Sequence, residues 1–142
     1  SGSVLVVGGG VVGCETAEFL IENSKKVTDV TVLEMQDRMA TEVSTNYRPF
    51  FIERLKEAGI KLFTRVEVKE ITEKGAKVSR EGTGEEFIEG NAIVLAVGLR
   101  AHNNFVEELK GIVAESYAAG DCIAPGGIKE AMEQGFLVGN KI

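Results

Sequence analysis

Three glycines near the start of the chain have a spacing that suits the binding of a dinucleotide. Gly8, Gly10 and Gly13 form a G-x-G-x-x-G pattern between an apolar run and a helical pattern. The first glycine permits a tight strand-to-helix turn, and the second lets the backbone approach a pyrophosphate. The third lets helix and strand pack closely, with the phosphates at the positive helix N-terminus. We therefore predict a cofactor-binding loop made of Gly8, Gly9, Gly10, Val11, Val12 and Gly13.

An acidic residue supports this interpretation of the glycines. Glu34 ends the second apolar run and follows Gly13 by about twenty residues, the separation at which dinucleotide sites place a carboxylate that bonds the adenosine ribose. A carboxylate there would repel a 2′-phosphate, so NAD(H) is expected over NADP. Arg38 is the one nearby feature that could weaken this preference. In the alternative interpretation, Glu34 is a surface residue that merely ends a strand.

The elements that position these residues alternate between strand and helix. Strands are predicted over residues 4–8 and 27–34, and helices over 11–23 and 44–59. This order favours parallel strands with right-handed crossovers. In the first helix we expect one exposed and one buried face; the exposed face comprises Glu15, Glu18 and Glu22, and the buried face Val12, Thr16, Phe19 and Leu20.

The pattern changes after residue 60. Polar and apolar residues alternate up to residue 90 with two turn signals, which predicts a strand over 61–64 and then a small antiparallel meander. The run over 92–97 is continuously apolar, as in a strand buried on both faces. The meander strands are expected at 66–71, 76–79 and 86–88, and a short strand at 117–119 and a helix at 128–142 complete the chain.

Composition narrows the functional classes. The chain has 142 residues and a net charge of −6, which gives nucleic acid or an anionic membrane no electrostatic attraction. We expect no membrane span and no signal peptide. Cys14 and Cys122 form no C-x-x-C pair, so a reduced, cytoplasmic chain is expected. Both cysteines lie near helix starts, which could lower a thiol pKa, but inert buried cysteines are the favoured interpretation.

Two segments carry a resemblance to a known family. Residues 8–17 read GGGVVGCETA and residues 120–131 read GDCIAPGGIKEA. With the meander between them, they resemble the pyridine nucleotide-disulfide oxidoreductase superfamily. Within it they are similar to the C-terminal region of NADH:flavin oxidoreductases, a branch that includes 2-enoate reductase, 2,4-dienoyl-CoA reductase and NADH oxidase. The resemblance implies an α/β fold: a Rossmann-type parallel sheet with helices on one face and an inserted antiparallel β-meander on the other.

The resemblance also implies a domain division and further site residues. Residues 1–100 would form the NAD(H)-binding domain, and 101–142 would rejoin an FAD-binding domain whose remainder is absent. Glu15 matches a helix glutamate near the nicotinamide, or is simply an exposed helix residue. Gly98 matches a glycine beside the nicotinamide, or merely turns the chain. Asp121 matches the acid that bonds the ribityl chain of FAD, or caps the last helix.

The leading functional hypothesis is an NADH-binding module of a flavin-dependent oxidoreductase. It would position the nicotinamide for hydride transfer to FAD, and electrons would pass to a substrate domain elsewhere in a parent chain. Hydride transfer needs no acid–base residue, so we predict no catalytic residue and no metal site; a homo-oligomer is compatible with the sequence. Two alternatives remain open, an FAD-binding domain of the same superfamily and a non-catalytic nucleotide-sensing domain.

Overall fold

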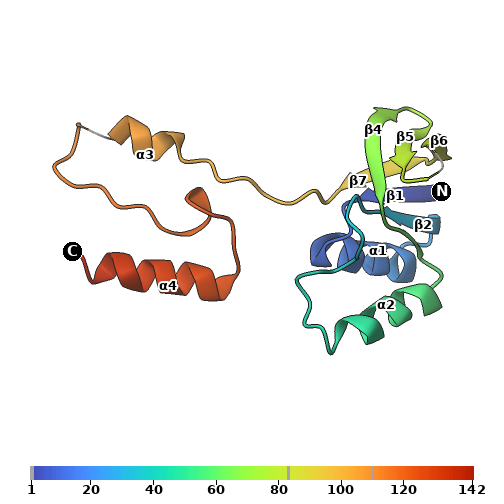
Figure 1. Ribbon diagram of the computed structural model, residues 1–142, viewed down its shortest axis with the longest axis horizontal. Helices are drawn as coiled ribbons and strands as arrows, with labels where there is room; N and C mark the ends of the chain where they lie inside the picture. The colour runs from blue at the N-terminus through green and yellow to red at the C-terminus, as the bar shows by residue number, and fades with distance from the viewer. Residues whose placement is uncertain (1, 83, 110) are drawn as a thin grey trace. The chain divides into compact units, whose positions relative to one another are not determined.

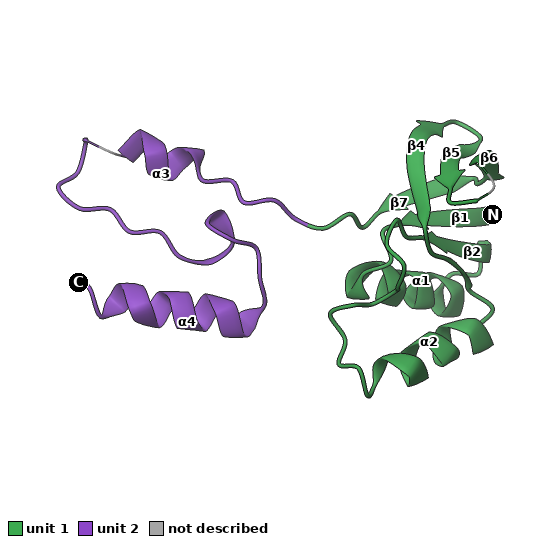
Figure 2. Cartoon of the chain, in the orientation of Figure 1, with its two compact units in different colours: residues 1–98 green, residues 99–142 purple. Residues whose placement is uncertain are grey.

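The chain forms two compact units. The computed structural model describes residues 2–82, 84–109 and 111–142. Residues 1–98 make up the first unit and residues 99–142 the second (Figure 2). In the first unit, strands and helices alternate as far as residue 63, and only strands follow up to residue 95. Among the described residues, all the paired strands belong to this unit.

A four-stranded parallel sheet forms the centre of the first unit. Its strands are β1 (Gly2–Val7), β2 (Val27–Leu33), β3 (Lys61–Phe63) and β7 (Ala92–Leu95), in the order β3-β2-β1-β7. The two central strands are rich in β-branched residues, which suit a pleated, buried surface. Val6 of β1 lies between Val32 of β2 and Val94 of β7 in register. The carboxyl ends of β1 and β2 therefore lie next to each other.

Two different layers cover the two faces of this sheet (Figure 1). One face packs against α1 (Val11–Asn23) and α2 (Arg48–Glu57), with Val4 and Val6 in that core. The other face packs against a three-stranded antiparallel sheet through a second core that contains Leu5. The antiparallel strands are β4 (Val66–Thr72), β5 (Gly75–Arg80) and β6 (Gly84–Glu89). Side chains that alternate along β1 thus supply both cores, and the predicted fold class is confirmed.

The faces of α1 differ from the prediction. Val12 and Phe19 are 69% and 64% exposed, although their spacing suggested a buried stripe. The helix instead approaches the sheet through its small residues Gly13, Cys14 and Ala17. Small side chains let the helix lie close to β1. Because the small residues face the sheet, Val12 and Phe19 point away from it. Hydrophobic periodicity could not identify this buried face, because glycine, cysteine and alanine contribute little to the hydrophobic pattern.

One strand is shorter and more exposed than predicted, and another predicted strand does not form. The run over 92–97 is paired only as far as Leu95, which is 61% exposed because β7 is an edge strand. Residues 117–119 form no strand in the described structure. A strand requires a hydrogen-bonding neighbour, and no described segment of the second unit pairs with these residues.

Helix α2 is shorter than the range 44–59 that the sequence predicted. It starts at Arg48, because a turn closed by the Tyr47 N–H and the Ser44 carbonyl comes first. Pro49 suits the first helical turn, where its missing N–H is not needed. Gly59 follows the helix with a φ of +82°, which fits the predicted stop.

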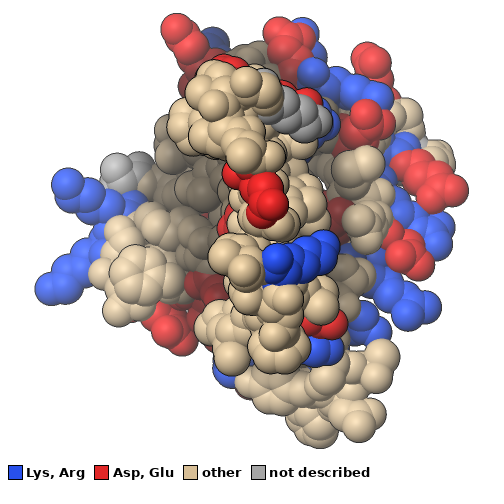
Figure 3. All heavy atoms as spheres, turned by 90° about the vertical axis from the view of Figure 1, so that its left-hand side faces the viewer, with Lys and Arg blue, Asp and Glu red and all other residues tan. Residues whose placement is uncertain are grey.

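The second unit contains short helices. They are α3 (Asn104–Leu109), the 3-10 turn η1 (Gly120–Cys122) and α4 (Ile128–Gly139), so the last helix ends before residue 142. The Glu130 carboxylate accepts a hydrogen bond from the Gly127 N–H at 2.9 Å, and backbone hydrogen bonds lower the pKa of that carboxyl. None of the described helices is long and apolar enough to cross a bilayer. Figure 3 shows acidic and basic side chains interspersed on the face that it draws.

Candidate functional site

The glycine loop joins the carboxyl end of β1 to the start of α1. Gly8 has a φ of +107°, and a Cβ there would collide with the carbonyl oxygen of Ala96 on the neighbouring segment. A Cβ on Gly13 would collide with the Gly8 carbonyl oxygen. The first and third glycines are therefore required by the turn and by the close packing of α1 on β1. Substitution of either residue would displace backbone.

The peptide groups of Gly9 tie the loop to three other segments. The Gly9 N–H donates to the Glu34 carboxylate at 2.6 Å. The Gly9 carbonyl accepts from the Ala40 N–H at 2.7 Å and from the Cys14 thiol at 3.4 Å. The middle of the loop is thus held by β2, by the segment that follows β2 and by α1.

Glu34 is a buried acid at the end of β2. Its exposed fraction is 9%, and its second carboxylate oxygen accepts from the Gln36 N–H at 2.7 Å. Both oxygens of Glu34 therefore bond backbone N–H groups, and each retains a lone pair for a further donor. The structure thus brings Glu34 into contact with the glycine loop, although the two are distant along the chain.

Cys14 is a buried thiol in the first turns of α1. Burial and the nearby acids Glu42, Glu34 and Glu15 raise the pKa of the Cys14 thiol to about 12. Any lowering by the helix N-terminus, the less favoured alternative, is therefore outweighed, and the thiol keeps its proton at neutral pH. Cys14 acts here as a donor to the Gly9 carbonyl.

One acid beside the loop was not anticipated from the sequence. Glu42 lies in the polar segment between β2 and α2, and its Oε1 lies 2.7 Å from the point where a Cβ on Gly10 would stand. Gly10 is the N-cap of α1 and the second glycine of the pattern. No motif marks Glu42, because its position follows from the path of the chain after β2.

The other predicted residues lie at separate places. Val11 is partly buried at the first position of α1, Val12 is exposed, and Glu15 is exposed one turn later. Gly98 ends the first unit with a φ of +83°. Asp121 belongs to the second unit, where its carboxylate accepts from the Gly126 N–H at 3.3 Å, just before α4.

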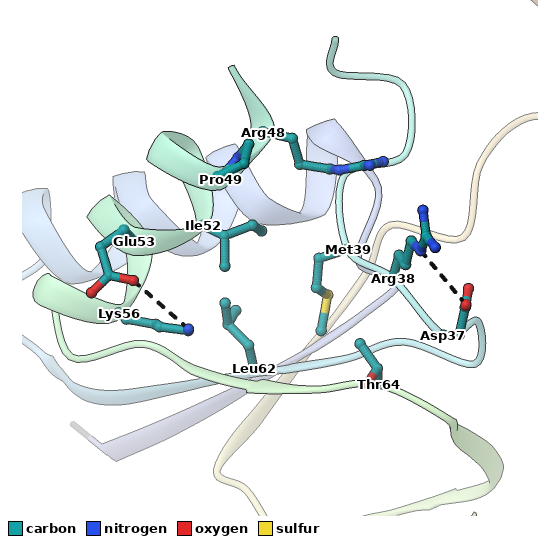
Figure 4. Close-up of a pocket in the computed structure, with 10 residues that line it drawn as sticks. All are labelled: Asp37, Arg38, Met39, Arg48, Pro49, Ile52, Glu53, Lys56, Leu62 and Thr64. Atoms are coloured by element: carbon teal, nitrogen blue, oxygen red, sulfur yellow. Dashed lines mark ion pairs between the residues drawn. The ribbon is translucent and has the colours of Figure 1, made fainter. Parts of the chain in front are cut away.

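A pocket of about 460 Å³ lies near the loop, between α2, β3 and the segment after β2 (Figure 4). Met39, Ile52 and Leu62 supply apolar side chains that point into it. The Arg38–Asp37 pair lies on its border with 3.7 Å between charged atoms, so the Arg38 guanidinium faces a carboxylate. The sulfur of Met39 also lies close to the point where a Cβ on Gly9 would stand, so this residue contacts both the pocket and the loop.

Comparisons with known proteins relate this architecture to a protein family. The family model described as pyridine nucleotide-disulphide oxidoreductase matches residues 1–135. The chain is 34% identical over 141 residues to a bilirubin reductase of Mediterraneibacter gnavus, covering 99% of this chain and 21% of the relative. It is 36% identical over 139 residues to an NADH oxidase of Thermoanaerobacter brockii, covering 95% of this chain and 20% of the relative.

Solved structures give the same result. A 2-naphthoyl-CoA reductase in complex with 2-naphthoyl-CoA superposes with a TM-score of 0.83 at 28% sequence identity. The match covers 99% of this chain and 21% of that reductase. The chain thus spans about a fifth of the length of these relatives. The glycine loop and the parallel sheet, with helices on one face and the antiparallel sheet on the other, agree with the family match. This match shows that the chain belongs to the pyridine nucleotide-disulphide oxidoreductase family.

Proposed function

We propose that the chain is the NADH-binding module of a flavin-dependent oxidoreductase. The observation that carries this proposal is the hydrogen bond from the Gly9 N–H to the buried Glu34 carboxylate. This bond supports the proposal because the acid that we assign to the ribose lies directly beside the loop that we assign to the phosphates. The family match supports a nucleotide-binding oxidoreductase module, and the choice of NADH is our inference from Glu34.

The loop suits a pyrophosphate. Helix α1 begins without a capping side chain because its N-cap is Gly10, so its first N–H groups are available to an anion. The missing Cβ of Gly10 allows close approach to the backbone. A buried carboxylate at the end of β2 disfavours an additional 2′-phosphate, which supports NADH over NADPH.

The chain's own residues would position the cofactor rather than carry out chemistry. A nicotinamide bound there would supply a hydride to a flavin. We propose that Glu15 and Gly98 lie beside the nicotinamide, and that the exposed carboxylate of Glu15 bonds the carboxamide. No proton needs to move through a side chain of this module.

The flavin would be held elsewhere in a parent chain. We propose that residues 101–142 complete an FAD-binding domain in which Asp121 bonds the ribityl chain, while a further domain reduces the substrate. The relatives are about five times longer than this chain, which supports a larger parent. The chain alone should then bind the nucleotide without turnover.

Calorimetric titration of the full chain tests the proposal. NADH should bind at least about tenfold more tightly than NADPH, since one charge–charge conflict is worth about 1.4 kcal/mol or more. Glu34→Gln should weaken NADH binding by about tenfold, because the neutral amide cannot accept from both backbone N–H groups. Asp37→Asn, an exposed acid three residues away, is the matched control and should leave the affinity unchanged.

Other results would favour the alternatives. Equal affinity for NADH and NADPH, or none for either, contradicts the proposal. A purified protein with flavin absorbance would instead support an FAD-binding domain. Specific NADH binding that changes the oligomeric state of the chain would support a nucleotide-sensing role.

A further inference from the structure

We propose that the carboxylate of Glu42 occupies the place of the dinucleotide pyrophosphate and competes with it, which limits the affinity of the site. This inference rests on the proposed function. It assigns an affinity-determining role to a residue outside the glycine pattern and outside β2.

The position of the carboxylate is the first observation. The second glycine of the pattern lacks a Cβ so that a pyrophosphate can approach the backbone. In this structure Glu42 Oε1 lies 2.7 Å from the missing Cβ of Gly10. An anionic side chain therefore lies in the space that the pattern reserves for an anionic ligand.

The segment that carries Glu42 is attached to the loop, which is the second observation. The Ala40 N–H donates to the Gly9 carbonyl at 2.7 Å, and the Val43 N–H donates to the Ala40 carbonyl at 3.1 Å. Ala40 is fully buried and adopts a left-handed φ of 48°, which is uncommon for alanine. This turn holds the backbone of Glu42, two residues after the anchor, where its side chain can reach Gly10.

The local field explains why the carboxylate stays there and why a ligand must displace it. The positive N-terminus of α1 stabilises one anion. Glu42 competes for that stabilisation, and Glu34 and Glu15 add negative charge around the same turn, as their shared effect on the Cys14 thiol shows. A pyrophosphate therefore gains less stabilisation from the helix N-terminus until the Glu42 side chain moves away. Because Glu42 is exposed, its side chain can rotate away, and the effect on affinity should be modest.

The test compares the wild-type chain with Glu42→Gln, which keeps the size of the side chain and removes its charge. Calorimetric titrations with NADH and ADP should show about two- to fivefold tighter binding by the variant, the range for one exposed charge interaction. Adenosine has no phosphate, so the two proteins should bind it with the same affinity, or neither should bind it detectably. The gain should shrink as salt rises from 0.05 M to about 0.5 M, because screening weakens exposed charges.

Asp37→Asn is the matched control, because it removes an exposed acid of the same segment that pairs with Arg38 rather than facing the loop. It should not change the affinity for NADH or ADP. Unchanged or weaker NADH binding by Glu42→Gln, with tight binding by the wild type, overturns this inference and leaves the proposed function intact. An equal gain for adenosine also overturns it. Absence of NADH and ADP binding by both proteins contradicts the proposed function as well.

Discussion

The two units of the chain bury their apolar side chains to very different extents. In the first unit, two cores cover both faces of the parallel sheet, and residues such as Val6 and Leu55 are fully buried. All the buried hydrophobic side chains of the described residues belong to this unit. In the second unit, Ile128, Met132 and Phe136 recur at helical spacing along α4 and are 71–82% exposed.

This contrast shows that a regular amphipathic pattern does not by itself make an independent fold. The first unit brings strands and helices together around shared cores, whereas the apolar face of α4 lies open in the described unit. Such a face is typical of a segment that packs against another part of a longer chain. The proposed role of residues 101–142 in a divided FAD-binding domain requires a face of this kind.

Hydrogen exchange should reveal the largest difference between the units. Amides of β1, β2 and α1 should exchange only through global unfolding, which costs about 5 kcal/mol or more for a typical domain. Amides of α4 should be protected by less than about 1 kcal/mol, because a helix of this length is marginal without tertiary packing. Mass spectrometry of the full chain measures both. Equal protection in α4 and β1 would contradict the contrast.

Matched leucine truncations sharpen the comparison. Leu55→Ala should lower the free energy of unfolding by about 3 kcal/mol, because the side chain is fully buried between α2 and the sheet. Leu137→Ala should change it by less than about 0.5 kcal/mol, since Leu137 is 55% exposed. Urea denaturation followed by circular dichroism measures the two values. A cost for Leu137→Ala close to that of Leu55→Ala would mean that α4 packs in the isolated chain.

The cysteines give a smaller, pH-dependent difference. The Cys14 pKa is raised from 9.0 to about 12 in the folded state, so the unfolded chain loses this proton first as pH rises. Stability should therefore be unaffected by this group below about pH 8.5 and fall by about 1.4 kcal/mol per pH unit above pH 9.

Cys14→Ala should remove that part of the alkaline slope, whereas Cys122→Ala, a partly exposed position of the second unit, should retain it. Denaturation curves between pH 8 and 11 compare the slopes of the three proteins. The same slope in all of them would show that Cys14 ionises without a folding penalty.

Local sequence patterns were sufficient to predict most of the elements of the first unit. The glycine spacing, the β-branched runs and the switch to polar–apolar alternation predicted the loop, the parallel strands and the meander, because each depends on short-range sterics and periodicity. The errors lie where another segment decides the outcome. The outward turn of Phe19 depends on how closely α1 approaches β1, and the exposure of Leu95 depends on which strand lies at the edge of the sheet.

The sequence alone determined the glycine loop, the acid Glu34 and the family, because these depend on residue types at set separations. Only the tertiary structure showed that Glu34 and Cys14 both bond the Gly9 peptide groups and that Glu42 stands beside Gly10. The physical reason is that a side chain's partners depend on the path of the whole chain. Separation along the sequence does not encode that path between β2 and α2.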